Sequence, residues 1–129
     1  MSDASQDGAV RSDVTAAISD AMASPLSRHT GRGATSSRTT LSRDLIVCVM
    51  GDALTKGEQS LLRHGRPEVV LSIRKAYQDC MAREAIGVIE ELSGRRVAAF
   101  MSDNHIEPDL AVEIFVLQRA PNGDKPDEA

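Results

Sequence analysis

The chain has 129 residues, a formal net charge of −4 and an apolar fraction of 41%, which fits a single domain with an aliphatic core. It has no Trp, one Tyr and two Phe, so recognition of single-stranded nucleic acid through stacked bases is disfavoured. No apolar run approaches the roughly 18 residues of a membrane span, and the polar N-terminus lacks the pattern of a signal peptide. We therefore expect a soluble cytoplasmic protein that does not insert into the membrane.

Charge is distributed unevenly along the chain. Residues 1–24 hold one basic and four acidic residues, residues 25–102 hold twelve and eight, and residues 103–129 hold two and seven. The acidic total argues against non-specific DNA binding, whereas the basic middle allows a small anion or an acidic partner to bind. Ordinary solvated charge is the alternative interpretation.

The two ends and the first helix come first in chain order. Residues 1–10 and 119–129 are polar and are expected to be disordered, which leaves one domain over residues 11–118. Apolar residues at helical spacing predict a helix over 13–24, which Pro25 is expected to end or kink. The next residues are rich in Gly, Ser and Thr and predict a loop, followed by a short edge strand at 39–43.

The middle of the chain carries clear element signals. Residues 45–50 (LIVCVM) are apolar at every position and predict a central strand covered by helices on at least one side. Thr55 and Glu58 have the spacing of a capping box, which predicts a short helix ending near Gly65. Pro67 and Gly94 suit the first turn and the end of a long helix over 67–93.

The last predicted element is a hairpin of strands 96–102 and 110–118, joined by a turn rich in Asp, Asn and Pro. The order α-β-β-α-α-β-β predicts an α+β fold, with a small mixed or antiparallel sheet of about four strands packed on two to three helices. Cys48 and Cys80 lie in apolar periodic segments and are predicted to be buried free thiols.

The first candidate site is the basic segment from Arg28 to Arg43. Its glycines allow a close backbone approach, and its arginines supply paired donors for phosphate or carboxylate. It lacks the Lys-Ser/Thr ending of a phosphate loop, so a solvated connecting loop is the alternative. The predicted binding residues here are Arg28, Arg32, Gly33 and Arg38.

The second candidate site is the turn that contains Asp103, His105 and Asp109. These side chains could contact a ligand or a partner, could hold a divalent ion, or could form a purely structural turn. No second His or Cys supports zinc, and the spacing of a calcium loop is absent, so we assign no metal. No nucleophile elbow or His-Glu-x-x-His helix occurs, and we predict no catalytic residue and no cofactor.

Several stretches of the sequence resemble a known bacterial family. They are GRGA, the segment SRTTLSRDLIVCVMGDALTKGEQSLLRHGR, and the segment ELSGRRVAAFMSDNHIEPDLAVEIFVL after the long helix. Together they resemble the family of unknown molecular role named for the MpsC component of a sodium-translocating, membrane-potential-generating system. The family pattern falls on Gly31, Arg32, Gly33, Arg38, Thr55, Glu58, Gly65, Gly94, Arg95, Asp103, His105 and Asp109.

The resemblance implies a small cytoplasmic protein, peripheral to the inner face of the membrane, that acts with a system moving ions or inorganic carbon. The leading hypothesis is a non-enzymatic accessory or regulatory module, a homo-oligomer such as a dimer, that binds a transport subunit or a small anion through its Gly-Arg loop. Two other hypotheses stay open at this point: a small RNA-binding α+β domain, and a metal-dependent enzyme centred on His105.

Overall fold

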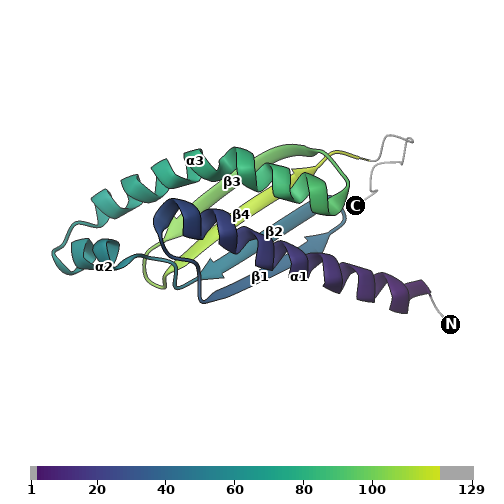
Figure 1. Cartoon of the computed structure of the whole chain (residues 1–129), viewed down its shortest axis with the longest axis horizontal. Helices are drawn as coiled ribbons and strands as arrows, with labels where there is room; N and C mark the ends of the chain where they lie inside the picture. Colours follow the sequence, from purple (N-terminus) through teal and green to yellow (C-terminus); the bar gives the residue numbers. More distant parts are fainter. Residues whose placement is uncertain (1–2, 120–129) are drawn as a thin grey trace.

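The computed structural model describes residues 3–119, with side chains from residue 13 onward (Figure 1). The predicted order α-β-β-α-α-β-β and the α+β class are confirmed. The tail over 120–129 that the sequence predicts to be disordered lies outside the described residues. The elements are α1 (Asp3–Thr30), β1 (Ser36–Ser42), β2 (Leu45–Gly51), α2 (Lys56–Arg63), α3 (Pro67–Ser93), β3 (Val97–His105) and β4 (Leu110–Leu117).

The four strands form one antiparallel sheet in the order β1-β2-β4-β3. The apolar strand β2 is therefore central, as its sequence predicts. Helices α1 and α3 lie side by side across one face of this sheet, and α2 lies at one end of it (Figure 1). Within residues 3–119 no helix or strand covers the opposite face. We call this uncovered side the open face.

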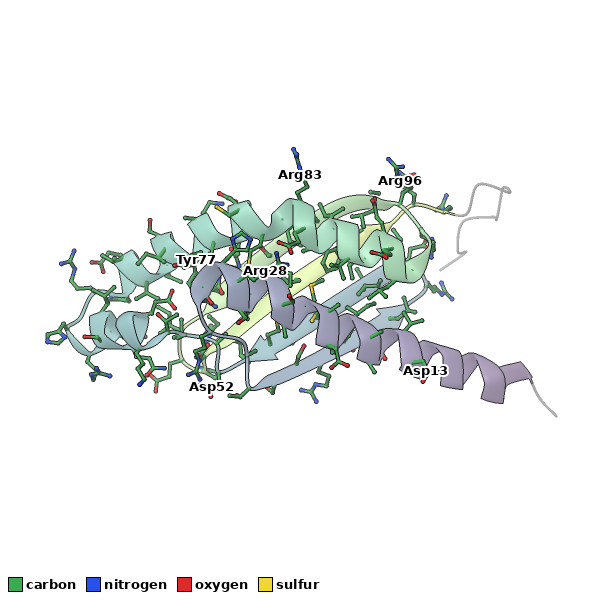
Figure 2. All side chains as sticks on the ribbon, viewed as in Figure 1. Asp13, Arg28, Asp52, Tyr77, Arg83 and Arg96 are labelled. Atoms are coloured by element: carbon green, nitrogen blue, oxygen red, sulfur yellow. The ribbon has the colours of Figure 1, made fainter. Side chains whose placement is uncertain are left out.

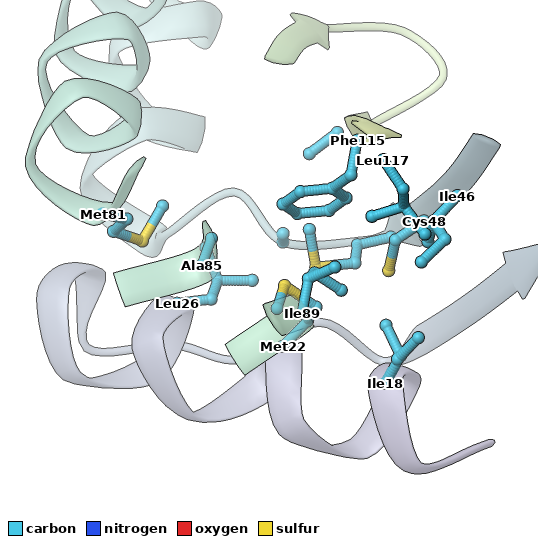
Figure 3. Packing of buried hydrophobic residues seen from close by; sticks show 13 residues of the cluster. Ile18, Met22, Leu26, Ile46, Cys48, Met81, Ala85, Ile89, Phe115 and Leu117 are labelled. Atoms are coloured by element: carbon cyan, nitrogen blue, oxygen red, sulfur yellow. The ribbon is translucent and has the colours of Figure 1, made fainter. Parts of the chain in front are cut away.

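The core lies between the two helices and the inward side of the sheet (Figure 3). Alternate residues of β2 and β4 point inward because successive strand side chains face opposite sides. Phe100 and Phe115 pack on neighbouring strands with their ring centroids 5.0 Å apart. Its buried members include Ile18, Met22 and Leu26 from α1, Met81, Ala85 and Ile89 from α3, and Ile46, Cys48, Phe115 and Leu117 from the sheet.

Helix α1 differs from its prediction at both ends. It begins at Asp3, inside the predicted tail, and it continues through Pro25 to Thr30. A proline inside a helix removes one backbone hydrogen bond, at a cost of about 3 kcal/mol. Here Pro25 and Leu26 are both buried against the core, and this tertiary packing offsets the local cost of the proline.

Other predictions also change. The loop after α1 is confined to residues 31–35, so Arg28 is helical and Arg38 lies in β1. Strand β3 runs to His105, which shortens the hairpin turn to residues 106–109. Cys48 is buried as predicted, but Cys80 is exposed because it lies beside the buried stripe of α3 and not on it.

The capping box at the start of α2 is confirmed. The Thr55 hydroxyl accepts a hydrogen bond from the Glu58 amide at 3.1 Å, and the Glu58 carboxylate accepts one from the Thr55 amide at 2.8 Å. These two bonds fix the direction in which the chain enters α2 after leaving β2.

Thr55→Ala is expected to lower the free energy of unfolding by about 1 kcal/mol, because it leaves a helix amide without its acceptor. Urea denaturation followed by circular dichroism measures this change. Ser72→Ala is the matched control, because Ser72 is exposed within α3 and Ala has the higher helix propensity. Equal stabilities for the two variants would contradict the proposed role of the cap.

Candidate functional site

Three connecting segments meet at the end of the sheet beside α2: the α1–β1 loop, the β2–α2 segment and the β3–β4 turn. The Arg32 guanidinium donates to the Asp52 carbonyl at 3.0 Å and lies 3.2 Å from the Asp52 carboxylate. Asp52 in turn donates its amide to the Asp109 carbonyl at 3.0 Å. The Asp109 carboxylate accepts from the Leu54 amide, also at 3.0 Å. Arg32 and Asp109 are thus joined through Asp52, and both help to hold this end together.

Arg28 lies in the last turn of α1 and not in the loop. Its guanidinium forms an ion pair with Glu84 of α3, and the His29 ring lies 3.4 Å from the same carboxylate. Figure 2 shows Arg28 on the side of α1 next to α3. The pair connects the two helices at the surface, where the Arg28 side chain keeps 60% of its exposure. Gly33, also predicted as a binding residue, lies in the loop itself, where an added Cβ would come no closer than 4.0 Å to the Ala23 carbonyl.

Arg38, Asp103 and His105 lie on the open face of the sheet. The register places Arg38 opposite Val49, Val49 opposite Val112, and Val112 opposite Asp103, in one row across all four strands. Residues opposite each other in neighbouring strands project to the same face. Arg38 and Asp103 therefore mark the two edges of this row.

Two shallow hollows lie on the open face, next to each other. One, of about 430 Å³, includes Arg38 in its lining, and the other, of about 370 Å³, includes Asp103 and His105. Val49 and Leu110 line both hollows. The predicted residues therefore separate into two groups. Arg28, Arg32 and Asp109 contact other elements of the protein through their side chains. Arg38, Asp103 and His105 border hollows that face outward, and among residues 13–119 the side chains of Asp103 and His105 make hydrogen bonds only within their own hairpin, to the Asn104 amide and the Pro108 carbonyl.

A buried polar cluster was not found by sequence reasoning. Arg74 of α3 donates to the Glu58 carboxylate at 3.3 Å and to the Asn104 side chain at 3.5 Å. Glu113 of β4 lies on the same inward side, and the exposed fractions of Arg74, Glu58 and Glu113 are only 3%, 3% and 5%. Among the described residues, one carboxylate oxygen of Glu58, one of Glu113 and the Gln78 side-chain nitrogen have no hydrogen-bond partner.

Burial dominates the electrostatics of Glu113. Removal from water disfavours the carboxylate and raises its pKa from 4.5 to about 7, although the nearby Arg74 charge acts in the opposite direction. Two voids of about 10 Å³ each border Glu113, and each has about the size needed for one water molecule. The site can therefore take up a proton close to neutral pH.

The sequence contained a usable signal for this cluster. In β4, Glu113 stands between Ala111 and Phe115 in the alternation of inward-facing residues. In α3, Arg74 occupies the apolar stripe that includes Val70 and Met81. A charged residue at an inward-facing position of an amphipathic helix or strand indicates a buried charge that is paired with another group.

Metal binding and membrane insertion also bear on what this domain can do. No three His, Cys, Asp or Glu side chains among residues 13–119 are grouped as ligands for a metal ion. In the same part of the chain, none of the helices combines the length and the apolar character required to cross a membrane.

The fold and these surfaces define a small α+β domain with two helices on one face of a four-stranded antiparallel sheet. The model of a family described as "Na+-translocating membrane potential-generating system (MpsC)" matches residues 11–119, and the chain belongs to this family. The resemblance noted in the sequence is thereby confirmed, and membership supports a role as an accessory module of such a system. Neither the curated proteins nor the solved structures include a significant match to the chain.

Replacement of Glu113 by Gln tests the raised pKa. Between pH 4.5 and about 7 the folded state holds a proton that the unfolded state has released, so the wild-type stability falls as pH rises through this range. Glu113→Gln removes this dependence, and at pH 8 the variant should be more stable than wild type by up to roughly 3 kcal/mol. Urea titrations at pH 5 and pH 8 measure the difference.

Glu68→Gln is the control for this experiment. Glu68 is fully exposed, and its hydrogen bond with Arg66 lowers the pKa of its carboxyl group. Replacing this carboxylate by an amide therefore removes a small stabilising contribution at pH 8, and the variant should not be more stable than wild type. If Glu113→Gln and wild type keep the same stability difference at both pH values, the assignment of a proton to Glu113 is wrong.

Proposed function

We propose that this chain is a non-enzymatic accessory or regulatory subunit of a bacterial sodium-translocating or related transport system. In this proposal it works at the cytoplasmic face of the membrane and binds an acidic segment of a transport subunit. The family match over residues 11–119 is the observation that carries the proposal. The basic residues around the Gly31–Gly33 loop are its candidate contact surface.

Arg28 and Arg32 are the residues that we propose to contact the partner. They stand on either side of Gly31, at the end of α1, with side chains that are 60% and 33% exposed. A guanidinium has five N–H donors, so a single carboxylate does not use all of them. Both arginines thus retain donors for a carboxylate supplied by a partner, or for a small anion.

The present ion pairs of these arginines do not prevent such binding. Asp52, the carboxylate beside Arg32, is 56% exposed, and Glu84, beside Arg28, is 30% exposed. Exposed ion pairs contribute at most about 1 kcal/mol, so exchanging an internal carboxylate for an external one costs little. Gly31 has open space around the position of an added Cβ, which lets a partner backbone approach the loop.

The test measures binding of the purified full chain to acidic peptides from the cytoplasmic segments of sodium-translocating subunits, at low and high salt. Arg28→Ala with Arg32→Ala is expected to weaken binding about tenfold or more, and salt should weaken wild-type binding because surface charges are screened. Inorganic phosphate in place of the peptide tests the small anion separately.

The double variant Arg83→Ala with Arg96→Ala is the matched control. It removes the same charge from two exposed arginines: Arg83 points away from the body of the protein in Figure 2, and the Arg96 side chain is 81% exposed. This variant should bind like wild type. The proposal fails if no salt-sensitive binding occurs, or if both double variants weaken binding equally.

A further inference from the structure

The open face of the sheet is apolar along its centre. Its two middle strands present Val47 and Val49 from β2, and Val112 and Ile114 from β4. On the neighbouring strand β3, Met101 is opposite Ile114 and is 50% exposed. No described helix covers these side chains, although the sheet carries an apolar row on this side as well as on the helix side.

The dimensions of this face match one layer of a β-sandwich. The outermost of four strands at their usual spacing lie about 14 Å apart, and seven residues of each strand span about 20 Å. Apolar side chains that gather on one exposed face of a sheet commonly mark an interface. Each Å² of apolar surface that is removed from water contributes about 25 cal/mol of favourable free energy. A second layer packed on this face would therefore be stabilised by the burial of these side chains.

The two edges of the face carry opposite charges at the same level of the sheet. Arg38 on β1 and Asp103 on β3 end the row that runs through Val49 and Val112. Both residues are exposed. The Arg38 side chain has no hydrogen bond or ion pair within the described part of the chain, and the Asp103 carboxylate accepts a hydrogen bond from the Asn104 amide at 2.8 Å. The face therefore has one basic side chain at one edge and one acidic side chain at the other.

This charge arrangement is complementary to itself. A two-fold axis parallel to the strands places β1 of one copy over β3 of the other at the same height, so each Arg38 meets Asp103 of the second copy. A two-fold axis perpendicular to the strands would instead place β1 over β1 and bring like charges together. Opposite charges favour the first arrangement and like charges disfavour the second.

We propose that a second copy of this chain packs its open face against the first, to form a two-fold symmetric β-sandwich. The apolar centres of the two sheets provide the affinity, and two Arg38–Asp103 pairs set the register. The hollow beside Arg38 of one copy then lies over the hollow beside Asp103 and His105 of the other. Arg28 and Arg32 remain outside this interface, so the proposal is independent of the acidic partner.

The test is the mass of the full chain by sedimentation equilibrium over a wide concentration range. Wild type should be a dimer, and Met101→Glu should weaken dimerisation about a hundredfold, because two charges would be buried against an apolar layer. Leu71→Glu is the control: Leu71 is 43% exposed on α3, away from the open face, and this variant should remain dimeric.

Charge reversal tests the register without disturbing the core. Arg38→Glu and Asp103→Arg are each expected to weaken the dimer about tenfold, since each puts like charges opposite one another, and the combination of both should restore wild-type affinity. A wild-type protein that stays monomeric, or a dimer unaffected by Met101→Glu, would overturn the proposal. Single reversals without effect, or a combination that fails to restore affinity, would overturn the strand-parallel arrangement.

Discussion

The central pair of strands, β2 and β4, is the element on which the rest of the structure depends. Their antiparallel register aligns apolar residues on both faces of the sheet. The inward set, which includes Cys48 and Phe115, is fully buried under α1 and α3. The outward set has no cover within the described chain. Because alternation in a strand is strict, one pair of strands forms both the core and the surface available to another molecule.

Local signals in the sequence predicted most of the fold because they act over a few residues. Thr55 and Glu58 cap α2, Pro67 begins α3, and Gly94 ends it in a left-handed conformation with φ of 71°. The effect of Pro25 could not be predicted from local signals alone, because α1 continues through it to Thr30. Its cost is local, whereas the burial that offsets it depends on a sheet more than ten residues away, and such packing is not visible in a local pattern.

The candidate site was less predictable than the fold, for a related reason. Sequence reasoning grouped Arg28 with Arg38 and Asp103 with Asp109 because they are close in the chain. Helix ends and strand alternation separate them, so that Asp109 binds the β2–α2 segment whereas Asp103 lies at the edge of the open face. Glu113 was missed because strand 110–118 was predicted from its β-branched and aromatic content, and a single charge does not alter that signal.

Glu113 lies on the same strand as residues of the open face, so the stability of that strand depends on both sides of the sheet. It lies between Val112 and Ile114 in β4, so its side chain enters the helix layer while theirs point outward. An ionised Glu113 that is buried beside Arg74 lowers the stability of this strand in its folded position. A second copy that binds only the folded sheet adds stability by mass action. In the proposed dimer, burial of the outward side of β4 would offset the cost of keeping a carboxylate on its inward side, and the offset would grow with protein concentration.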